Sequence, residues 1–208
     1  MQILNCEQGT QEWLNARLGI ITASNAELLL VKGKGDNGLG DGLISYLEQL
    51  GAERFTGQSD TEFTGNDHTD RGHTLEPIVS DYYNGMGYSK GEPISQVGII
   101  LNHAELVGYD VGASPDRLVG DKGGLEIKTR LSKLQFRLLR TDDIGKKHLA
   151  QIQFCLWVTG RDWWDYISFC EGMPFYIKRV YPDLEVHKTF ETKAKIAYQW
   201  LDETMAKM

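Results

Sequence analysis

Three charged residues near the middle of the chain have the types and spacing of a site that could hydrolyse a phosphodiester. Asp116 precedes a Gly-rich turn, and Glu126 and Lys128 follow that turn in the stretch GGLEIKTR. Side chains alternate between the two faces of a strand, so Leu125 and Ile127 should enter the core while Glu126 and Lys128 project together on the other side. Because the turn reverses the chain, we expect Asp116 to lie beside Glu126.

Two carboxylates and an ammonium at one point have a clear chemical use. Adjacent carboxylates repel each other, and Mg²⁺ relieves that repulsion while keeping waters and phosphate oxygens as its other ligands. Such an ion lowers the pKa of a bound water and neutralises the leaving oxygen, and Lys128 would hold or deprotonate the attacking water. The alternative is a solvated strand face, on which Glu-x-Lys is also common, so this short motif alone does not establish a nuclease.

Further motifs occur in a fixed order along the chain. They are the stretch EWLNARLGIITAS at 12–24, the RG-x(3)-E motif from Gly72 to Glu76, Ser114-Pro115-Asp116 followed by LEIK, and HLAQIQFCLWVTG at 148–160. Together they resemble the lambda-type phage exonucleases and their YqaJ-like relatives, within the PD-(D/E)xK nucleases, over most of the chain. Arg117 departs from the family pattern, which has glycine after the aspartate. It would be an extra phosphate contact or an exposed residue.

The resemblance implies an α/β fold in which a central mixed β-sheet is flanked by helices. It also implies catalysis with Mg²⁺, two ions in all, for which Mn²⁺ may substitute. Asp116 and Glu126 would bind the metal, helped by Glu76 and the backbone carbonyl of Ile127. Lys128 would position or activate the water. Gln151 would orient water or phosphate; alternatively it is an ordinary polar residue of its helix.

The resemblance further implies that Arg17, Ser24 and Ser114 bind the 5′-phosphate of a DNA end. Ser24 and Glu27 have the spacing of a capping box, which predicts a helix beginning at Ser24. The free N–H groups at the start of a helix favour an anion, and an arginine such as Arg17 can make two hydrogen bonds to a phosphate. Ser24 could equally be a plain helix cap.

Periodicity and turn residues predict the elements that must position these groups. A Pro77 in the first turn of a helix capped by Thr74 would be tolerated, because N–H groups there have no intrahelical partner. We expect helices at 10–19, 24–31, 42–55, 74–85, 146–160 and 188–208. We expect strands within 95–101, 105–120, 123–130, 163–170 and 174–181. No linker divides the chain, so residues 1–208 should form a single domain.

Composition narrows the class of protein. The chain has 208 residues and a net charge of −7, which argues against non-specific coating of nucleic acid but not against a local basic groove. The cysteines Cys6, Cys155 and Cys170 form no CxxC pattern, which favours a reducing compartment and disfavours structural zinc. We find no signal peptide and no apolar run near the roughly 20 residues that span a bilayer. We therefore expect no membrane association and an intracellular location, and the resemblance implies the cytoplasm of a bacterial host of a phage or prophage.

The sequence and the resemblance together predict a Mg²⁺-dependent 5′→3′ exonuclease that degrades one strand of linear double-stranded DNA to mononucleotides. The resemblance implies a ring-shaped homotrimer and, as a partner, a single-strand-annealing recombinase that would take the exposed 3′ tail. Several alternatives remain open at this point. The same site could serve a structure-specific endonuclease or a helicase-associated nuclease domain, or the chain could be a DNA-end-binding module or a phage structural protein without catalysis.

Overall fold

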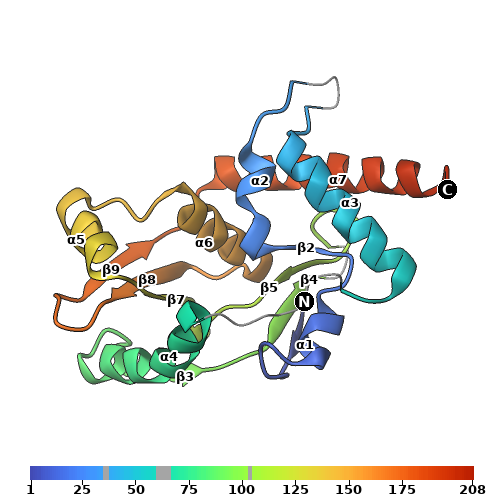
Figure 1. The fold of residues 1–208 in the computed structure, drawn as a ribbon. Coiled ribbons are helices and arrows are strands. Elements are labelled where there is room, and N and C mark those ends of the chain that lie inside the picture. The colour runs from blue at the N-terminus through green and yellow to red at the C-terminus, as the bar shows by residue number, and fades with distance from the viewer. Residues whose placement is uncertain (35–37, 60–66, 103–104) are drawn as a thin grey trace.

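The computed structural model describes residues 1–34, 38–59, 67–102 and 105–208, without the side chains of 67–73, and shows two mixed β-sheets enclosed by helices (Figure 1). The strand orders are β1-β4-β5-β2 and β3-β6-β7-β8-β9. The strands are β1 Gln2–Leu4, β2 Ile21–Thr22, β3 Ile94–Ser95, β4 Ile99–Asn102, β5 Val111–Ala113, β6 Arg117–Val119, β7 Gly123–Thr129, β8 Trp163–Phe169 and β9 Tyr176–Val180. The α/β class is confirmed, and its mixed strands divide between two sheets.

The helices cover both sheets. They are α1 Gln11–Ala16, the 3₁₀ turn η1 Ala23–Asn25, α2 Glu27–Leu30, α3 Asp41–Thr56, α4 Asp67–Gly85, α5 Ser132–Thr141, α6 Lys146–Thr159 and α7 Leu184–Met205. Most of the expected helices are confirmed, and α7 begins earlier than predicted because the Asp183 carboxylate caps it, accepting from the N–H groups of Glu185 and Val186. None of the helices in the described ranges is both long and apolar enough to cross a membrane.

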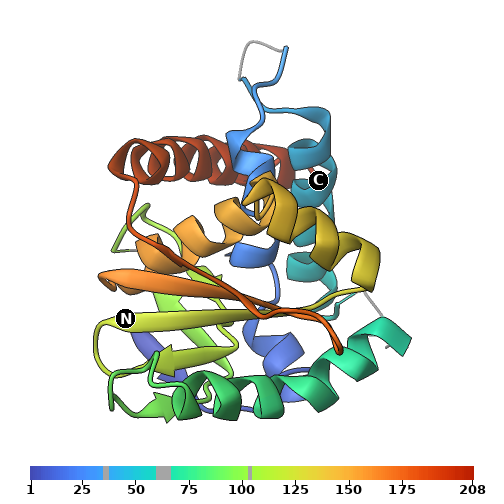
Figure 2. The same ribbon diagram turned by 90° about the vertical axis from the view of Figure 1, so that its left-hand side faces the viewer.

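The five-stranded sheet lies between α4 on one face and α6 on the other (Figure 2). On the α4 side, Leu125 and Ile127 of β7 pack with Val79 and Tyr83 of α4. The opposite face of the sheet belongs to the larger core, which includes most of α6. The predicted alternation in β7 is therefore confirmed, and both of its faces are buried.

Strand β7 begins at Gly123, the first residue of the strand that we expected within 123–130. Gly123 and Gly124 are paired with Trp163 and Trp164 of the parallel strand β8. A Cβ on Gly123 or Gly124 would lie 2.2 Å or 2.4 Å from ring atoms of these tryptophans. The glycines therefore serve close packing between neighbouring strands as well as the turn.

Two expectations about helix starts are wrong. Ser24 lies inside the short turn η1, and α2 begins only at Glu27 without a side-chain cap, so Ser24 is not a helix cap. Helix α4 begins at Asp67, so Pro77 lies in its interior and not in a first turn capped by Thr74. The short strands β1 and β2 were not predicted because each offers too few residues, and the helix α5 was also missed.

Candidate active site

The predicted nuclease residues are brought together where β6 and β7 meet. Asp116 directly precedes β6, and its carboxylate accepts a hydrogen bond of 2.5 Å from the backbone N–H of Ile127. This bond fixes Asp116 beside β7, next to Glu126. Lys128 Nζ lies 2.5 Å from Glu126 Oε1. Glu76 reaches the same place from α4, with its carboxylate 4.0 Å from the Arg117 guanidinium. We call Glu76, Asp116, Glu126 and Lys128 the carboxylate site.

The Glu126 carboxylate is fully buried, and its charge is poorly compensated. Its Oε1 atom is in contact with the Lys128 ammonium alone, and its Oε2 atom has no hydrogen-bond partner within the described part of the chain. Burial, opposed by Lys128 and reinforced by Asp116 and Glu76, raises the pKa of Glu126 to about 7. Burial also raises the pKa of Glu76 to about 7, with a further contribution from Asp116. Negative charge is therefore costly here until a cation is added.

The lysine stays protonated in this setting. Burial lowers the pKa of Lys128, but the charges of Glu126 and Asp116 outweigh burial and raise that pKa above its ordinary value. Lys128 is thus an ammonium, which can hold a water or offset negative charge. It is not set up to remove a proton.

The chemistry of the donors fits a divalent metal ion. In the described residues, no three His, Cys, Asp or Glu side chains form a complete metal cage. Mg²⁺ does not need one, because one or two carboxylates suffice when waters and phosphate oxygens complete the shell. The buried Glu126 Oε2 atom, which has no partner among the described residues, and the raised carboxyl pKa values are the observations that favour such an ion here.

Helix α6 covers the carboxylate site. Burial raises the pKa of the Cys155 thiol, and the charges of Glu126 and Asp116 raise it further, so this face of α6 lies over the carboxylates. Gln151, one turn earlier, is half-buried on the same face. That placement is compatible with its predicted role. Gly72 of the RG-x(3)-E motif lies within residues 67–73, whose side chains the structure does not describe.

Arg117 corrects one expectation, because it is buried, not exposed. Its guanidinium donates to the backbone carbonyl of Asp116 and lies near the Glu76 carboxylate. Where the family has glycine, this chain therefore has a cation beside Glu76, and that cation holds the pKa of Glu76 lower than it would otherwise be. In contrast, Asp121 and Lys122 are exposed turn residues, as predicted.

A second cluster adjoins the first. Arg17 donates through Nη1 to Ser114 Oγ at 3.1 Å, and through Nη2 to Ser24 Oγ at 3.0 Å and Thr22 Oγ1 at 3.2 Å. Its guanidinium also stacks 4.2 Å from the centre of the Trp13 ring. The structure thus brings the three predicted phosphate-binding residues together and adds two. We call Trp13, Arg17, Thr22, Ser24 and Ser114 the arginine site.

The arginine site holds a cation that forms no ion pair with a carboxylate of the described residues. No Asp or Glu oxygen of the described residues lies within ion-pair distance of the Arg17 guanidinium. Burial lowers the pKa of Arg17, and Tyr46 and Glu53 oppose that shift. A cavity of about 370 Å³ opens beside it, lined in part by Trp13, Arg17 and Thr22. A half-buried cation among hydroxyl groups, next to open space, suits an anion.

Hydrogen-bond directions make Ser114 a donor toward that anion. Trp13 Nε1–H can only donate, and it does so to Ser114 Oγ at 2.9 Å. The Arg17 guanidinium also can only donate, so both lone pairs of Ser114 Oγ are occupied. The hydroxyl hydrogen of Ser114 therefore points to a third partner, and an anionic oxygen would accept it.

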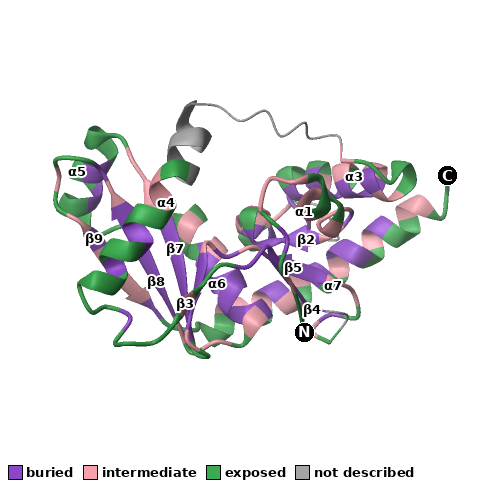
Figure 3. Ribbon diagram, turned by 90° about the horizontal axis from the view of Figure 1, so that it is seen from below, coloured by how far each residue is buried: buried purple, intermediate pink, exposed green. Residues whose placement is uncertain are grey.

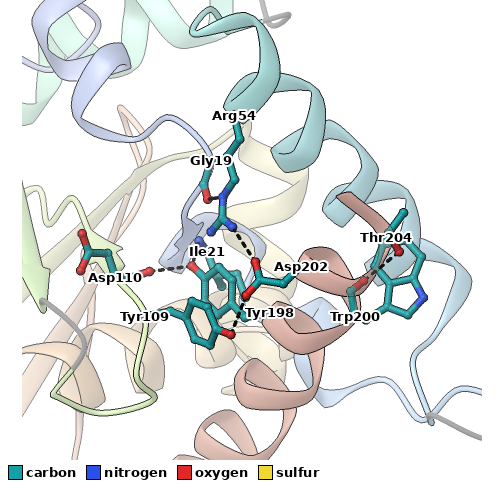
Figure 4. A network of polar contacts seen from close by, with 9 residues as sticks. All are labelled: Gly19, Ile21, Arg54, Tyr109, Asp110, Tyr198, Trp200, Asp202 and Thr204. Atoms are coloured by element: carbon teal, nitrogen blue, oxygen red, sulfur yellow. Dashed lines mark hydrogen bonds and ion pairs between the residues drawn. The ribbon is translucent and has the colours of Figure 1, made fainter. Parts of the chain in front are cut away.

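The arginine site is held in place by the β2–β5 pairing and by the C-terminal helix. Thr22 pairs with Gly112 in parallel register, which brings the segment of Arg17 next to Ser114. The Tyr198 hydroxyl of α7 accepts from the Ile21 N–H at 2.8 Å and donates to the Asp110 carbonyl at 2.6 Å (Figure 4). Arg54 Nε adds a bond of 2.9 Å to the Gly19 carbonyl. Sequence reasoning missed this bracing, since it joins residues far apart in the chain.

Comparisons with known proteins identify the family and the fold. Residues 12–162 match the model of the YqaJ-like viral recombinase domain. The structure of an alkaline exonuclease, LHK-Exo from Laribacter hongkongensis, has 28% identity, a TM-score of 0.80 and 95% coverage of each chain. LHK-Exo in complex with dAMP gives 29% identity, a TM-score of 0.79 and the same coverage.

A phage-related exonuclease from Haemophilus somnus shares the fold, with 14% identity, a TM-score of 0.62, and coverage of 91% of this chain and 96% of that one. No curated protein sequence matches. Since the family model spans well over half of the 208 residues, the chain belongs to the family of YqaJ-like viral recombinase domains.

Proposed function

We propose that the protein is a nuclease acting on DNA, and more specifically a Mg²⁺-dependent exonuclease that removes nucleotides from 5′ ends of double-stranded DNA. The proposal is supported by family membership, by the likeness to LHK-Exo and by the composition of the two sites. LHK-Exo, which shares 29% identity, has been crystallised with dAMP, and such a nucleotide is the kind of product that we propose for this chain.

One observation carries the proposal. Ser114 belongs to the arginine site and Asp116 to the carboxylate site, and only Pro115 separates them. Two residues of extended chain span at most about 7 Å, which is comparable to the length of one nucleotide. A strand whose 5′-phosphate binds at Arg17 would therefore present the next phosphodiester to Asp116 and Glu126. This spacing favours the release of single nucleotides.

Each residue then has a role that follows from its surroundings. Glu126 and Asp116, helped by Glu76 and the Ile127 carbonyl, would hold the metal ions. When bound, Mg²⁺ or Mn²⁺ would supply an acidified water and neutralise the leaving oxygen. Lys128, as an ammonium, would hold water and stabilise negative charge on the phosphate. Gln151, on the covering helix, would orient water or phosphate.

A duplex labelled at one 5′ end or at one 3′ end tests the activity and its direction. With Mg²⁺, a 5′→3′ exonuclease releases the 5′ label first as a mononucleotide, and EDTA stops the release. Asp116→Ala and Lys128→Ala should abolish release while the protein stays folded, and Asp121→Ala, an exposed turn residue, should not. Activity in both site variants would refute the assignment. Nicking of covalently closed circular DNA would instead indicate an endonuclease.

We also propose that the protein assembles as a homotrimeric ring and acts with a single-strand-annealing recombinase. These two points rest on the resemblance to the family and not on contacts of this chain. Sedimentation analysis of the purified protein tests the first: a mass of three chains supports the ring, and a monomer contradicts it. Pull-down of the annealing protein on partly digested DNA tests the second.

A further inference from the structure

Helix α5 presents an unusual surface close to the carboxylate site. Lys133, Phe136, Arg137 and Arg140 follow one another at helical spacing, so they share one face, which we call the α5 face. All four side chains are exposed, and Phe136 is 64% exposed. The helix begins four residues after Lys128, which places its start at most about 14 Å along the chain from that catalytic lysine.

The side of α5 opposite the α5 face is attached to the rest of the protein by hydrogen bonds and packing. The buried side chain of Gln135 donates to the Pro174 carbonyl at 2.8 Å and to the Ser168 carbonyl at 3.2 Å, and it accepts from Ser168 Oγ at 2.5 Å. Leu138 is also buried, and the rest of α5 is exposed (Figure 3). The α5 face therefore points away from the protein on a rigid support.

The charges of the α5 face are not used within the described structure. None of the three cations, Lys133, Arg137 and Arg140, forms an ion pair with a described residue. The chain as a whole has a net charge of −7, so three unpaired cations on one helix face stand out from the acidic background. They suit a polyanion.

Phe136 indicates which polyanion. A phenyl ring that is 64% exposed between cations packs no core, but it can stack on a nucleobase. The bases of a duplex are already stacked on one another, whereas those of a single strand are free. Cations that follow a phosphate backbone, with an aromatic ring on which a base stacks, are the usual means of binding single-stranded DNA.

We infer that the α5 face binds single-stranded DNA, namely the uncut strand that is exposed as its complement is degraded. The inference rests on the proposed function, because only a nuclease that removes one strand generates this ligand at the carboxylate site. Phe136 would stack on an unpaired base, and Lys133, Arg137 and Arg140 would contact its phosphates. Holding that strand would keep it from re-entering the site.

Binding of a fluorescent oligo-dT strand to the full chain in EDTA tests this inference without catalysis. Phe136→Ala should weaken binding about 10-fold, as expected for the loss of one stacked base. The double variant Arg137→Ala/Arg140→Ala should weaken it and make the slope of log K against log salt shallower by about 1.4. Phe55→Ala, which removes another exposed phenylalanine, and Lys188→Ala/Lys207→Ala, which removes two exposed lysines, are the matched controls.

An abasic strand of the same length separates stacking from charge. On that strand Phe136→Ala should have no effect, while the double arginine variant should weaken binding as before. Equal binding of oligo-dT by the wild type and both α5 variants would overturn the inference. So would variants that change the mass in sedimentation but not DNA binding, because the face would then join copies of this chain.

The same protein preparations distinguish this inference from the proposed function. If the wild type binds oligo-dT through the α5 face and releases no nucleotides from duplex ends with Mg²⁺, the proposed function fails and the uncut strand is not the natural ligand. If it releases nucleotides and the α5 variants bind oligo-dT normally, only the inference about α5 fails.

Discussion

The carboxylate site and the arginine site have opposite charge imbalances, and Pro115 links them in the sequence. In the first, burial and neighbouring acids raise the pKa values of Glu76 and Glu126, and three carboxyl groups share one lysine, so negative charge is in excess. In the second, a half-buried guanidinium is surrounded by hydroxyl groups and forms no ion pair with a described carboxylate, so the site lacks negative charge. A divalent cation would complete one and a phosphate the other. A metal-bound DNA end supplies both, which explains why the two sites adjoin.

The largest expected effect separates the lysine from the acids within the carboxylate site. Lys128→Met should lower the rate of nucleotide release by about 100- to 1000-fold, because one preorganised donor to developing charge is lost. It should not weaken Mn²⁺ binding, whereas Asp116→Asn should reduce both. Single-turnover kinetics and calorimetry measure the two properties. Loss of Mn²⁺ binding in Lys128→Met would show that the lysine supports the metal ligands and does not act on the phosphate.

A smaller effect is expected at the arginine site. Arg17→Ala should reduce kcat/KM by about 10- to 100-fold on 5′-phosphorylated duplex, since a charge-assisted contact is lost. On 5′-hydroxyl duplex the same variant should behave like the wild type, and its Mn²⁺ affinity should be unchanged. Equal losses on both substrates would mean that Arg17 supports the fold and does not recognise the phosphate.

Trp13→Phe tests the hydrogen-bond direction at Ser114. The phenyl ring keeps contact with Arg17 but removes the indole N–H that occupies one lone pair of Ser114 Oγ. The Ser114 hydroxyl should then point away from the phosphate part of the time. Because one hydrogen bond to the phosphate is weakened, kcat/KM on 5′-phosphorylated ends should fall about 2- to 10-fold. Parallel assays with 5′-hydroxyl ends serve as the control. An unchanged preference for phosphorylated ends would contradict this role.

The smallest expected effect is an increase in the thermal stability of the Glu126→Gln variant at high pH. Burial raises the pKa of Glu126 to about 7 in the folded chain, whereas the pKa of this carboxyl in the unfolded chain is about 4.5. The metal-free wild type therefore loses stability as the pH rises from about 4.5 through 7. Glu126→Gln carries no charge and avoids that loss. Above pH 7 its Tm should exceed that of the metal-free wild type by several degrees, at about 2–4 °C for each kcal/mol. Thermal denaturation at low and high pH checks this, and a lower Tm for the variant at high pH would argue against it.

Local pattern was enough to predict much of the site. Alternation in β7 placed Glu126 and Lys128 on one face, and the turn brought Asp116 beside them, as the bond between Asp116 and Ile127 confirms. The long helices were also predictable from their periodicity. These features depend on residues that are close in the sequence.

Features that depend on distant contacts could not be predicted. Glu126 is buried close to Cys155 of α6, and the pairing of Arg117 with Glu76 joins two separate elements. Ser24 has a capping pattern, but the β2–β5 pairing holds the preceding residues extended and a helix begins only at Glu27. Tertiary contacts overrode local propensity at that point.

Binding of Mn²⁺ to the DNA-free chain as a function of pH tests the central claim most directly. If two carboxyls with pKa values of about 7 are the ligands, protons compete with the metal, and calorimetry between about pH 5 and pH 9 should show affinity rising with pH and levelling off above 7. Glu126→Gln should abolish that binding. An affinity that does not vary with pH, or that survives in Glu126→Gln, would contradict the account of the carboxylate site as a metal site.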